Sequence, residues 1–388
     1  MPTGYSYIRP LLLQFVALLF AAVAFVVPVR AENNDAGTLP QDVEKAVAAM
    51  LAAVPKGASV PSADVYAPML DFALRSAAET SNASPAKRPE GFGAYKRDTV
   101  KAPLSRILRY CYDPDIPAEA VYPSAVRRGF WLPGSDLLQK REPLWSSLDH
   151  LDAPIVLRGK EFEEITPDTS SGCYYAYKLD RLLILTRYQG RAVFISVSRQ
   201  QEPSTVGRKG AILGDDGNWE YIYSPVSGST MSGLGWVDTY MYDSASVAVF
   251  FEEAPGAHAT GYALFKWVNA GWNNMNVVKP KHIQAGTTRF LAGFKQVLES
   301  GKLPPAEDLA ALGRELRRKA DPDLRKGLDG YCDRLVVVGE KDNLLSSKDF
   351  WSVIKDSGYA QSLSHDELVS VYVKNFVKRK IGKPVLDG

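Results

Sequence analysis

The sequence predicts an α+β fold in which a central antiparallel, aromatic-rich β-sheet packs on one long helix, with further helices at both ends of the chain. Three observations indicate this class. A series of strand-like segments fills residues 155–268. Apolar residues at helical spacing follow over 286–298, and similar spacing marks segments near both termini. Strands gathered in one part of a chain, with helices before and after, are typical of an antiparallel sheet with segregated helices.

The first 31 residues have the composition of a secretory signal peptide. Arg9 supplies a positive charge, residues 11–27 are almost entirely apolar, and Ala31 completes a small-x-small cleavage site. Glu32 follows, so the cysteine of a lipid-anchored bacterial precursor is absent at that position. We therefore expect residues 1–31 to be cleaved and the protein to be exported to the periplasm or the extracellular space. The alternative is an uncleaved membrane anchor, because the apolar run has nearly the length that spans a bilayer.

The net charge excludes one class of partner. The chain has 46 Lys and Arg against 44 Asp and Glu, and removal of residues 1–31 takes away Arg9 and Arg30, which leaves 44 of each sign. A neutral chain lacks the basic excess that nucleic-acid binding needs, so we expect no nucleic-acid partner. With 46% apolar residues, the chain has ample material for a hydrophobic core.

Residues 32–103 are expected to form a helical N-terminal segment and a linker. A helix over 41–54 begins after Pro40 and carries apolar residues at helical spacing, and 62–78 has a similar pattern. Residues 82–103 lose this periodicity and contain several prolines and glycines, which indicates a loop or linker.

The β-rich region is predicted to begin with a strand at 106–112, and two short helices are predicted within 115–150. Its clearest feature is a hairpin whose strands, 174–188 and 191–199, join across Gln189-Gly190. The remaining predicted strands cover 155–157, 219–223, 236–251 and 262–268.

Aromatic side chains repeat at a period of two on these strands and therefore share faces of the sheet. Rings concentrated in this way either fill a core or line a ligand cavity. The candidate ligand-binding residues are these aromatic residues, an acid between them and a histidine near the long helix: Trp219, Tyr221, Tyr223, Trp236, Asp238, Tyr240, Tyr242, Trp267 and His282.

A long helix is predicted over 286–298, where apolar residues recur along one side. Residues 303–388 are expected to form a helical C-terminal region. Its predicted helices cover 305–319, 346–355 and 364–380. Ser364 and Glu367 form a capping box at the start of the last one.

The order of these elements resembles the helix-grip order of START-like domains. The resemblance covers residues 105–300, in which a strand, two short helices and six strands precede the long helix, and it rests on no sequence motif. Domains of this kind wrap a curved antiparallel sheet round the helix and commonly hold a hydrophobic ligand between the two. The resemblance therefore implies a helix-grip-like domain at 104–302 and a ligand-binding purpose for the aromatic face.

The three cysteines are expected to lie in an oxidising compartment. Cys332 belongs to a helical apolar stripe, which favours a buried thiol. Cys111 and Cys173 are then the candidate disulfide, which would close a loop of about 60 residues and stabilise the fold by roughly 4 kcal/mol. Because no two cysteines are close in sequence, neither a metal knuckle nor a thiol-redox site is indicated.

No motif for a catalytic, cofactor or metal site is recognisable. The four histidines lack the spacing that places a metal-binding pair on one helix, so we expect neither a metal nor a cofactor. Three acids, Asp238, Glu252 and Glu253, would serve as the paired carboxylates of a hydrolase if two of them met in a cleft. Asp238 is the most interesting of them because Trp236 and Tyr240 would flank it.

Three functions remain, and the first leads. It is non-enzymatic binding of a hydrophobic or aromatic small molecule or lipid in the cell envelope, against the aromatic face. The second is a structural or interaction module whose terminal helices dock an envelope protein or a second copy of the chain, and an exposed apolar patch on 364–380 would favour it. The third is a hydrolase that uses the paired carboxylates.

Overall fold

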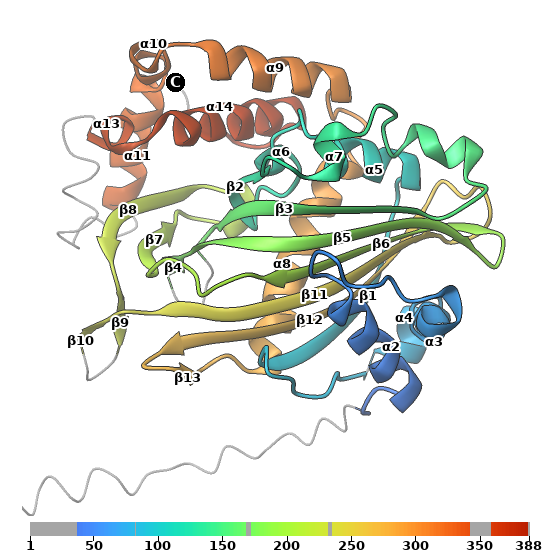
Figure 1. The fold of residues 1–388 in the computed structure, drawn as a ribbon. Helices are drawn as coiled ribbons and strands as arrows, with labels where there is room; N and C mark the ends of the chain where they lie inside the picture. Colours follow the sequence, from blue (N-terminus) through green and yellow to red (C-terminus); the bar gives the residue numbers. More distant parts are fainter. Residues whose placement is uncertain (1–36, 82, 168–171, 232–234, 342–357, 387–388) are drawn as a thin grey trace, which may run out of the picture. The chain divides into compact units, whose positions relative to one another are not determined.

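An eight-stranded antiparallel sheet is the centre of the structure (Figure 1). The computed structural model describes residues 37–81, 83–167, 172–231, 235–341 and 358–386. The predicted signal peptide and the predicted helix at 346–355 lie outside these ranges. In spatial order the strands are β1 (Phe92–Val100), β12 (Thr260–Trp272), β11 (Tyr240–Glu252), β6 (Arg191–Gln200), β5 (Ala176–Tyr188), β3 (Ile155–Ile165) and β2 (Val126–Trp131), with β13 (Met275–Asn276) paired to β12.

Helices flank this sheet, and two small sheets accompany it, so the predicted α+β class is confirmed. The small sheets consist of β4 (Cys173–Tyr174), β7 (Arg208–Ile212) and β8 (Tyr221–Ser227), and of β9 (Ser229–Met231) with β10 (Gly235–Val237). The helices are α2 (Gln41–Ala52), α3 (Ala63–Ala73), α4 (Ala77–Thr80), α5 (Leu104–Tyr112), α6 (Ala118–Val121), α7 (Asp136–Gln139), η2 (Ser146–His150), η3 (Asp216–Asn218), α8 (Pro280–Leu298), α9 (Ala306–Arg318), α10 (Asp321–Lys326), α11 (Asp329–Lys341), α13 (Gly358–Ser362) and α14 (His365–Lys380).

One face of the main sheet packs against the N-terminal helices α2 and α3, which lie on its near side in Figure 1. Alternation along β6 sends Val193, Ile195 and Val197 to this face, because successive side chains of a strand point to opposite sides. Met50 of α2 and Met69 of α3 are fully buried against it. The N-terminal helices are therefore part of the hydrophobic core.

The opposite face packs against α5 and α8, and α8 lies behind the sheet in Figure 1. Phe194 of β6 points to this side and meets Tyr112 of α5. Helix α8 packs against the edge strand β1. Lys295 of α8 pairs with Asp98 of β1 (Nζ to Oδ1, 2.9 Å), and Ile283 of α8 packs with Ala94 of β1. The main sheet is thus the middle of three layers.

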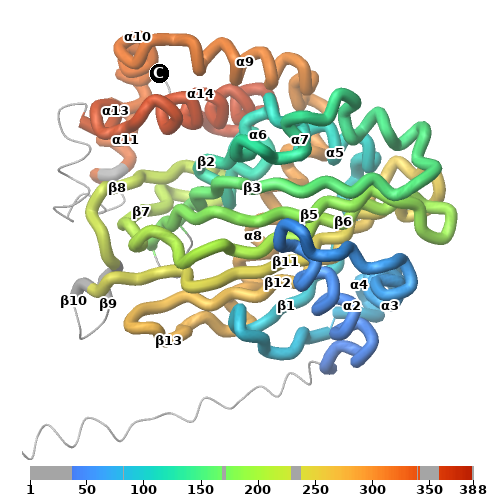
Figure 2. Tube along the Cα trace, viewed as in Figure 1, coloured from blue at the N-terminus to red at the C-terminus, as the bar shows by residue number. Residues whose placement is uncertain are grey.

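The C-terminal helices pack over β2, α6 and the small sheet that contains β8, as Figure 2 shows along the chain trace. Leu368, Val373 and Val377 of α14 are buried within the protein. The apolar residues of the predicted helix 364–380 therefore contribute to the core, and the exposed patch that would favour an interaction module is not found on this helix.

The predicted linker at 82–103 contains a strand, β1, which pairs along its whole length with β12. The prolines and Gly91 that indicated a loop precede or follow the strand. Gly91 has φ +115° and approaches the Val268 carbonyl so closely that a Cβ would lie 2.0 Å from its oxygen. Only glycine fits at this entry to the sheet.

The segment predicted as the first strand, 106–112, is the helix α5. Its buried residues Leu104, Ile107 and Leu108 recur every three to four positions, which is the helical period. The β-branched and aromatic residues that indicated a strand are accommodated because this face packs on the core. The two short helices predicted within 115–150 correspond to α6 and α7, and β2 between them was not predicted.

The predicted strand at 236–251 is divided, since β10 ends at Val237 and β11 begins at Tyr240. Trp219, expected to begin a strand, has a left-handed backbone (φ 60°) and precedes β8. The aromatic residues consequently do not form one continuous face. Within the described part of the chain, no helix combines the length and the apolar character needed to cross a bilayer.

Candidate functional site

The structure distributes the predicted ligand-binding residues over separate places. Trp267 is fully buried on the side of the main sheet that faces α2 and α3, where its indole donates a hydrogen bond to the Ala86 carbonyl (2.8 Å). Tyr240 and Tyr242 stack at the start of β11, with ring centroids 6.0 Å apart. Trp267 and the tyrosine pair thus belong to different surroundings.

Trp219, Tyr221 and Tyr223 lie below the C-terminal helices and are almost entirely buried. The Tyr221 hydroxyl donates to Asp216 (3.1 Å) and accepts from Arg289 (2.8 Å). These aromatic side chains fill the core between β8 and the C-terminal helices.

Two other predicted residues lie at the surface. Asp238 is exposed between β10 and β11. His282 is exposed in the first turn of α8, where its Nδ1 accepts a hydrogen bond from the Lys279 backbone N–H (3.3 Å). The side chain of Trp236 lies outside the described part of the structure. The predicted residues therefore do not form a single site.

The acids considered for a hydrolase do not converge as that hypothesis requires. Asp238 precedes β11 and Glu252 ends it, and a strand of 13 residues spans about 40 Å. Glu252 accepts from the Ala192 N–H (2.9 Å). Glu253 accepts from Arg97 (2.9 Å) and from the hydroxyl of Thr99 (2.6 Å). These contacts give Glu252 and Glu253 structural roles.

The predicted disulfide between Cys111 and Cys173 is not formed. Cys111 is an unpaired thiol at the end of α5, and burial raises its pKa to about 12. Cys173 lies on β4, where its sulfur accepts from the Thr239 hydroxyl (3.9 Å). Cys332 is buried in α11, as its apolar stripe predicts.

A row of polar side chains crosses the main sheet on the face toward α5 and α8. Lys266 of β12 lies opposite Ser246 of β11, which lies opposite Ser198 of β6, which lies opposite Arg181 of β5. Directly opposed residues of antiparallel strands share one face. We call the following set the polar row: Glu161, Glu163, Arg181, Ser196, Ser198, Ser246 and Lys266.

Arg181 makes two contacts within the polar row. Its Nη1 lies 3.4 Å from the Glu161 carboxylate, and its Nη2 donates to the Ser196 hydroxyl (2.8 Å). The hydroxyl oxygens of Ser198 and Ser246 are 2.8 Å apart and hydrogen-bonded. The row therefore includes hydroxyl groups that link adjacent strands.

The two remaining charged members differ in how they are satisfied. Glu163 accepts a hydrogen bond from the Tyr177 hydroxyl (2.7 Å). The Lys266 ammonium forms neither an ion pair nor a hydrogen bond with any residue that the structure describes. Burial lowers the Lys266 pKa; the Glu163 charge opposes this shift and the Arg181 charge adds to it.

Solvent reaches the polar row although protein surrounds it. The side chains of Glu161 and Arg181 each keep 16% of their surface exposed. Burial nevertheless raises the pKa of Glu161 to about 7, against the favourable charge of Arg181. A carboxyl group strongly desolvated and still partly exposed is typical of a functional site rather than of a surface ion pair.

Apolar and aromatic side chains border the polar row. Tyr122 stacks on Phe290 of α8 with centroids 5.6 Å apart, and the Arg181 guanidinium lies 5.8 Å from the centroid of the Trp131 ring. Several apolar residues that pack on this core remain only partly buried, namely Cys111, Tyr122, Trp131, Ala248 and Phe290. Charged groups and exposed apolar surface are therefore combined on one side of the sheet.

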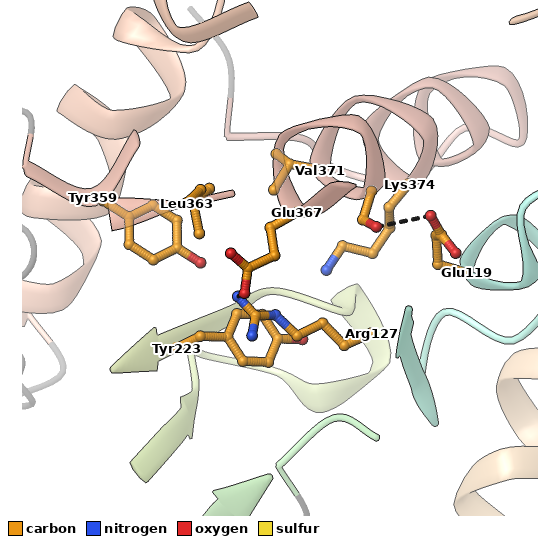
Figure 3. A pocket seen from close by; sticks show the side chains of 9 residues that line it. Glu119, Arg127, Tyr223, Tyr359, Leu363, Glu367, Val371 and Lys374 are labelled. Atoms are coloured by element: carbon orange, nitrogen blue, oxygen red, sulfur yellow. Dashed lines mark hydrogen bonds and ion pairs between the residues drawn. The ribbon is translucent and has the colours of Figure 1, made fainter. Parts of the chain in front are cut away.

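A second charged cluster lies between α14 and the sheets, around a cavity of about 10 Å³ (Figure 3). Arg127 pairs there with Glu367 (2.8 Å), and Ser370 donates to Glu119 (2.8 Å). Lys374 points into the cavity. A space of this size is at the lower limit for a single water molecule, so the cluster holds the fold together and has no room for an organic ligand.

An open groove of about 550 Å³ runs between the outer side of α8 and the loop around η3. Trp219 and Arg289 line it, and Arg289 donates to both carboxylate oxygens of Asp216 (2.6 and 2.8 Å). The α8 residues Ala285, Ala292 and Gln296 at its edge are exposed. The groove has sufficient volume for a ligand, but it is open to solvent, and its Arg289 and Asp216 already pair with each other.

The polar row was not predicted from the sequence, although the sequence of β6 contains a pattern that indicates it. Ser196 and Ser198 alternate with buried Ile195 and Val197, which places polar groups on one face of a strand buried on both sides. Such alternation on a buried strand indicates that the polar face meets something other than the apolar core.

The described residues contain no group of three or more His, Cys, Asp or Glu side chains that could hold a metal ion. Comparison with protein-family models, with curated proteins and with solved structures finds no match to this chain.

Proposed function

We propose that this protein is an exported binding protein that holds an amphipathic small molecule between the main sheet and helices α5 and α8. The single observation that carries the proposal is the polar row, whose charged members are surrounded by protein and yet reached by solvent. We include in the proposal that the sheet and α8 form a START-like domain, with β1 as its first strand.

Energetic cost supports a role for the polar row. Burying an ion pair such as Glu161 and Arg181 costs several kcal/mol of desolvation, which the mutual attraction repays only with excellent geometry. Here the Nη1 to Oε2 distance is 3.4 Å, and neither Glu161 Oε2 nor Arg181 Nε has a hydrogen-bond partner among the described residues. Apolar residues would stabilise this face better, so a ligand accounts for the charges.

The partly exposed apolar residues support the amphipathic character of the ligand. Phe290 and Tyr122 present aromatic surface beside the polar row, and Ala248 is a partly buried apolar residue of the sheet. Small-molecule sites in proteins combine mainly apolar walls with a few placed polar groups. The sheet face beside α8 has this composition.

The experiment is native mass spectrometry of the protein purified gently from its own envelope fraction, before and after denaturation. We expect a mass excess that disappears on denaturation. The matched variant Ser246→Trp places a large ring in the polar row and should lose the excess, whereas Val156→Trp, at an exposed position on β3, should keep it. Should Ser246→Trp fail to fold by circular dichroism, Ala248→Leu provides the milder obstruction. A bare protein mass in every sample would overturn the proposal.

A further inference from the structure

We infer that the ligand of this site is an organic acid whose carboxylate pairs with the Lys266 ammonium. The inference rests on the proposed function and adds the chemical class of the ligand. It follows from the charges of the polar row, from the hydroxyl groups next to Lys266 and from the apolar surface that continues beyond them.

Among the described residues, each charged member of the polar row except Lys266 has at least one partner within the protein. Arg181 is paired with Glu161 and with the hydroxyl of Ser196. Glu163 accepts a hydrogen bond from the Tyr177 hydroxyl (2.7 Å). Its charge affects the pKa of Lys266, but the two side chains form no hydrogen bond. Lys266 has no partner at hydrogen-bond distance among the described residues. Lys266 is only partly exposed, so its ammonium, which has no acceptor among the described residues, is available to a ligand that supplies one.

The hydroxyl groups beside Lys266 are suited to a carboxylate. Ser246 lies directly opposite Lys266, and its hydroxyl shares a hydrogen bond with Ser198 (2.8 Å). Opposed Cβ atoms of antiparallel strands are about 5 Å apart, so one carboxylate can contact both the ammonium and a hydroxyl donor. The Ser246 hydroxyl can rotate to donate a hydrogen bond to a carboxylate oxygen, and the Lys266 ammonium can only donate, so both groups favour a ligand that accepts.

Partly buried apolar residues on the same side of the sheet are available to the apolar part of the ligand. Ala248 lies on the same face of β11 as Ser246, two residues along, at a spacing of about 7 Å. Phe290 and Tyr122 lie on the helical side of this face and remain partly exposed. An acid with an extended alkyl or aromatic body would therefore place its carboxylate at Lys266 and its body against these residues.

The test compares three probes of equal chain length, decanoate, decanol and decylamine, binding to the full mature chain by isothermal titration calorimetry. We expect decanoate to bind the wild type at least tenfold more tightly than decanol, and decylamine to bind least tightly. Lys266→Met should remove the preference for decanoate and leave decanol affinity unchanged, while Lys266→Arg should retain the preference. The control Lys178→Met changes an exposed lysine of β5 on the opposite face and should have no effect.

The outcomes separate the inference from the function on which it rests. Equal binding of decanoate and decanol, or an unchanged preference in a folded Lys266→Met variant, would overturn the inference and leave a binding site in place. A preference for decylamine would assign the recognition to Glu161 or Glu163 and would also overturn it. If none of the probes binds and the native protein shows no mass excess, the proposed function itself fails. A Lys266→Gln variant repeats the measurement should Lys266→Met not fold.

Discussion

Arg127 of β2 and Glu367 of α14 form an ion pair (2.8 Å) in which the two side chains are only 6% and 14% exposed. On its other side Arg127 pairs with Glu164 (3.2 Å), and its guanidinium lies 3.8 Å from the centroid of the Tyr223 ring. Residues far apart in the sequence thus connect the C-terminal helix to the main sheet. Breaking this connection should be costly, because it leaves buried charge unpaired.

Glu367→Gln is therefore expected to lower the free energy of unfolding by about 2–3 kcal/mol. The amide oxygen of the new glutamine can still accept the hydrogen bond from the Ser364 N–H at the start of α14. The loss of stability therefore measures the contribution of the ion pair. The control Glu307→Gln removes a carboxylate from an exposed pair with Arg109 and should cost less than about 1 kcal/mol. Urea denaturation of both variants measures the difference, and equal costs would contradict the prediction.

Lys374 should make the stability of the protein depend on pH in the alkaline range. Burial and the Arg127 charge lower its pKa to about 7; Glu119 opposes this shift and Arg289 adds to it. The unfolded chain, in which a lysine titrates near about 10.4, then binds more protons than the folded protein between pH 7 and 10. The free energy of unfolding attributable to Lys374 should therefore rise as the pH is raised through this window.

Lys374→Met is accordingly expected to stabilise the protein at pH 7 by about 1–3 kcal/mol and to flatten this pH dependence. Lys380→Met changes an exposed lysine of the same helix and should shift stability by less than about 0.5 kcal/mol. Urea denaturation at pH 7, 8 and 9 distinguishes the two variants. A destabilised Lys374→Met protein that retains the wild-type slope would show that Lys374 is charged and satisfied.

Glu161 should give the opposite dependence at acidic to neutral pH. Its pKa is raised to about 7 in the folded protein, so the folded state binds more protons than the unfolded state between pH 4.5 and 7. The stability contribution of Glu161 is present below this window and is lost as the pH rises through it.

Between pH 5 and 8 the wild type should therefore lose stability relative to Glu161→Gln, by up to about 3 kcal/mol. Thermal or urea unfolding of both proteins across this range measures the difference. Glu315→Gln, on the exposed side of α9, provides the control and should follow the wild type at every pH. A constant difference between wild type and Glu161→Gln would show that Glu161 remains charged throughout.

A chain that begins at residue 104 should not fold. It lacks β1, whose whole length pairs with β12, and the helices α2 and α3 that cover one face of the main sheet. The uncovered face would expose Val193, Ile195 and Val197 to water, at about 25 cal/mol per Å² of apolar area. Circular dichroism and urea titration should show no cooperative transition, whereas a chain that begins at residue 32 should unfold cooperatively. A cooperative transition in the shorter chain would contradict the prediction.

Features that depend on neighbours in the sequence could be predicted. The hairpin of β5 and β6 turns at Gln189 and Gly190, whose positive φ values of 48° and 77° match the turn that such a dipeptide favours. Ser364 and Glu367 form the predicted capping box. In each case the residues that decide the geometry lie within a few positions of each other, so the pattern of the chain contains the information.

Features that depend on residues far apart in the sequence could not be predicted. Whether the segment 106–112 became a strand or a helix was decided by packing on the core, and the strand within 82–103 is held by β12, far along the chain. The sequence by itself determined the α+β class, the central hairpin and the helical ends. Only the tertiary structure brought Arg181 beside Glu161 and left Lys266 without a partner among the described residues, because strand register and helix packing set the distances between these side chains. Burial, which also depends on the tertiary structure, shifts the pKa of Lys266.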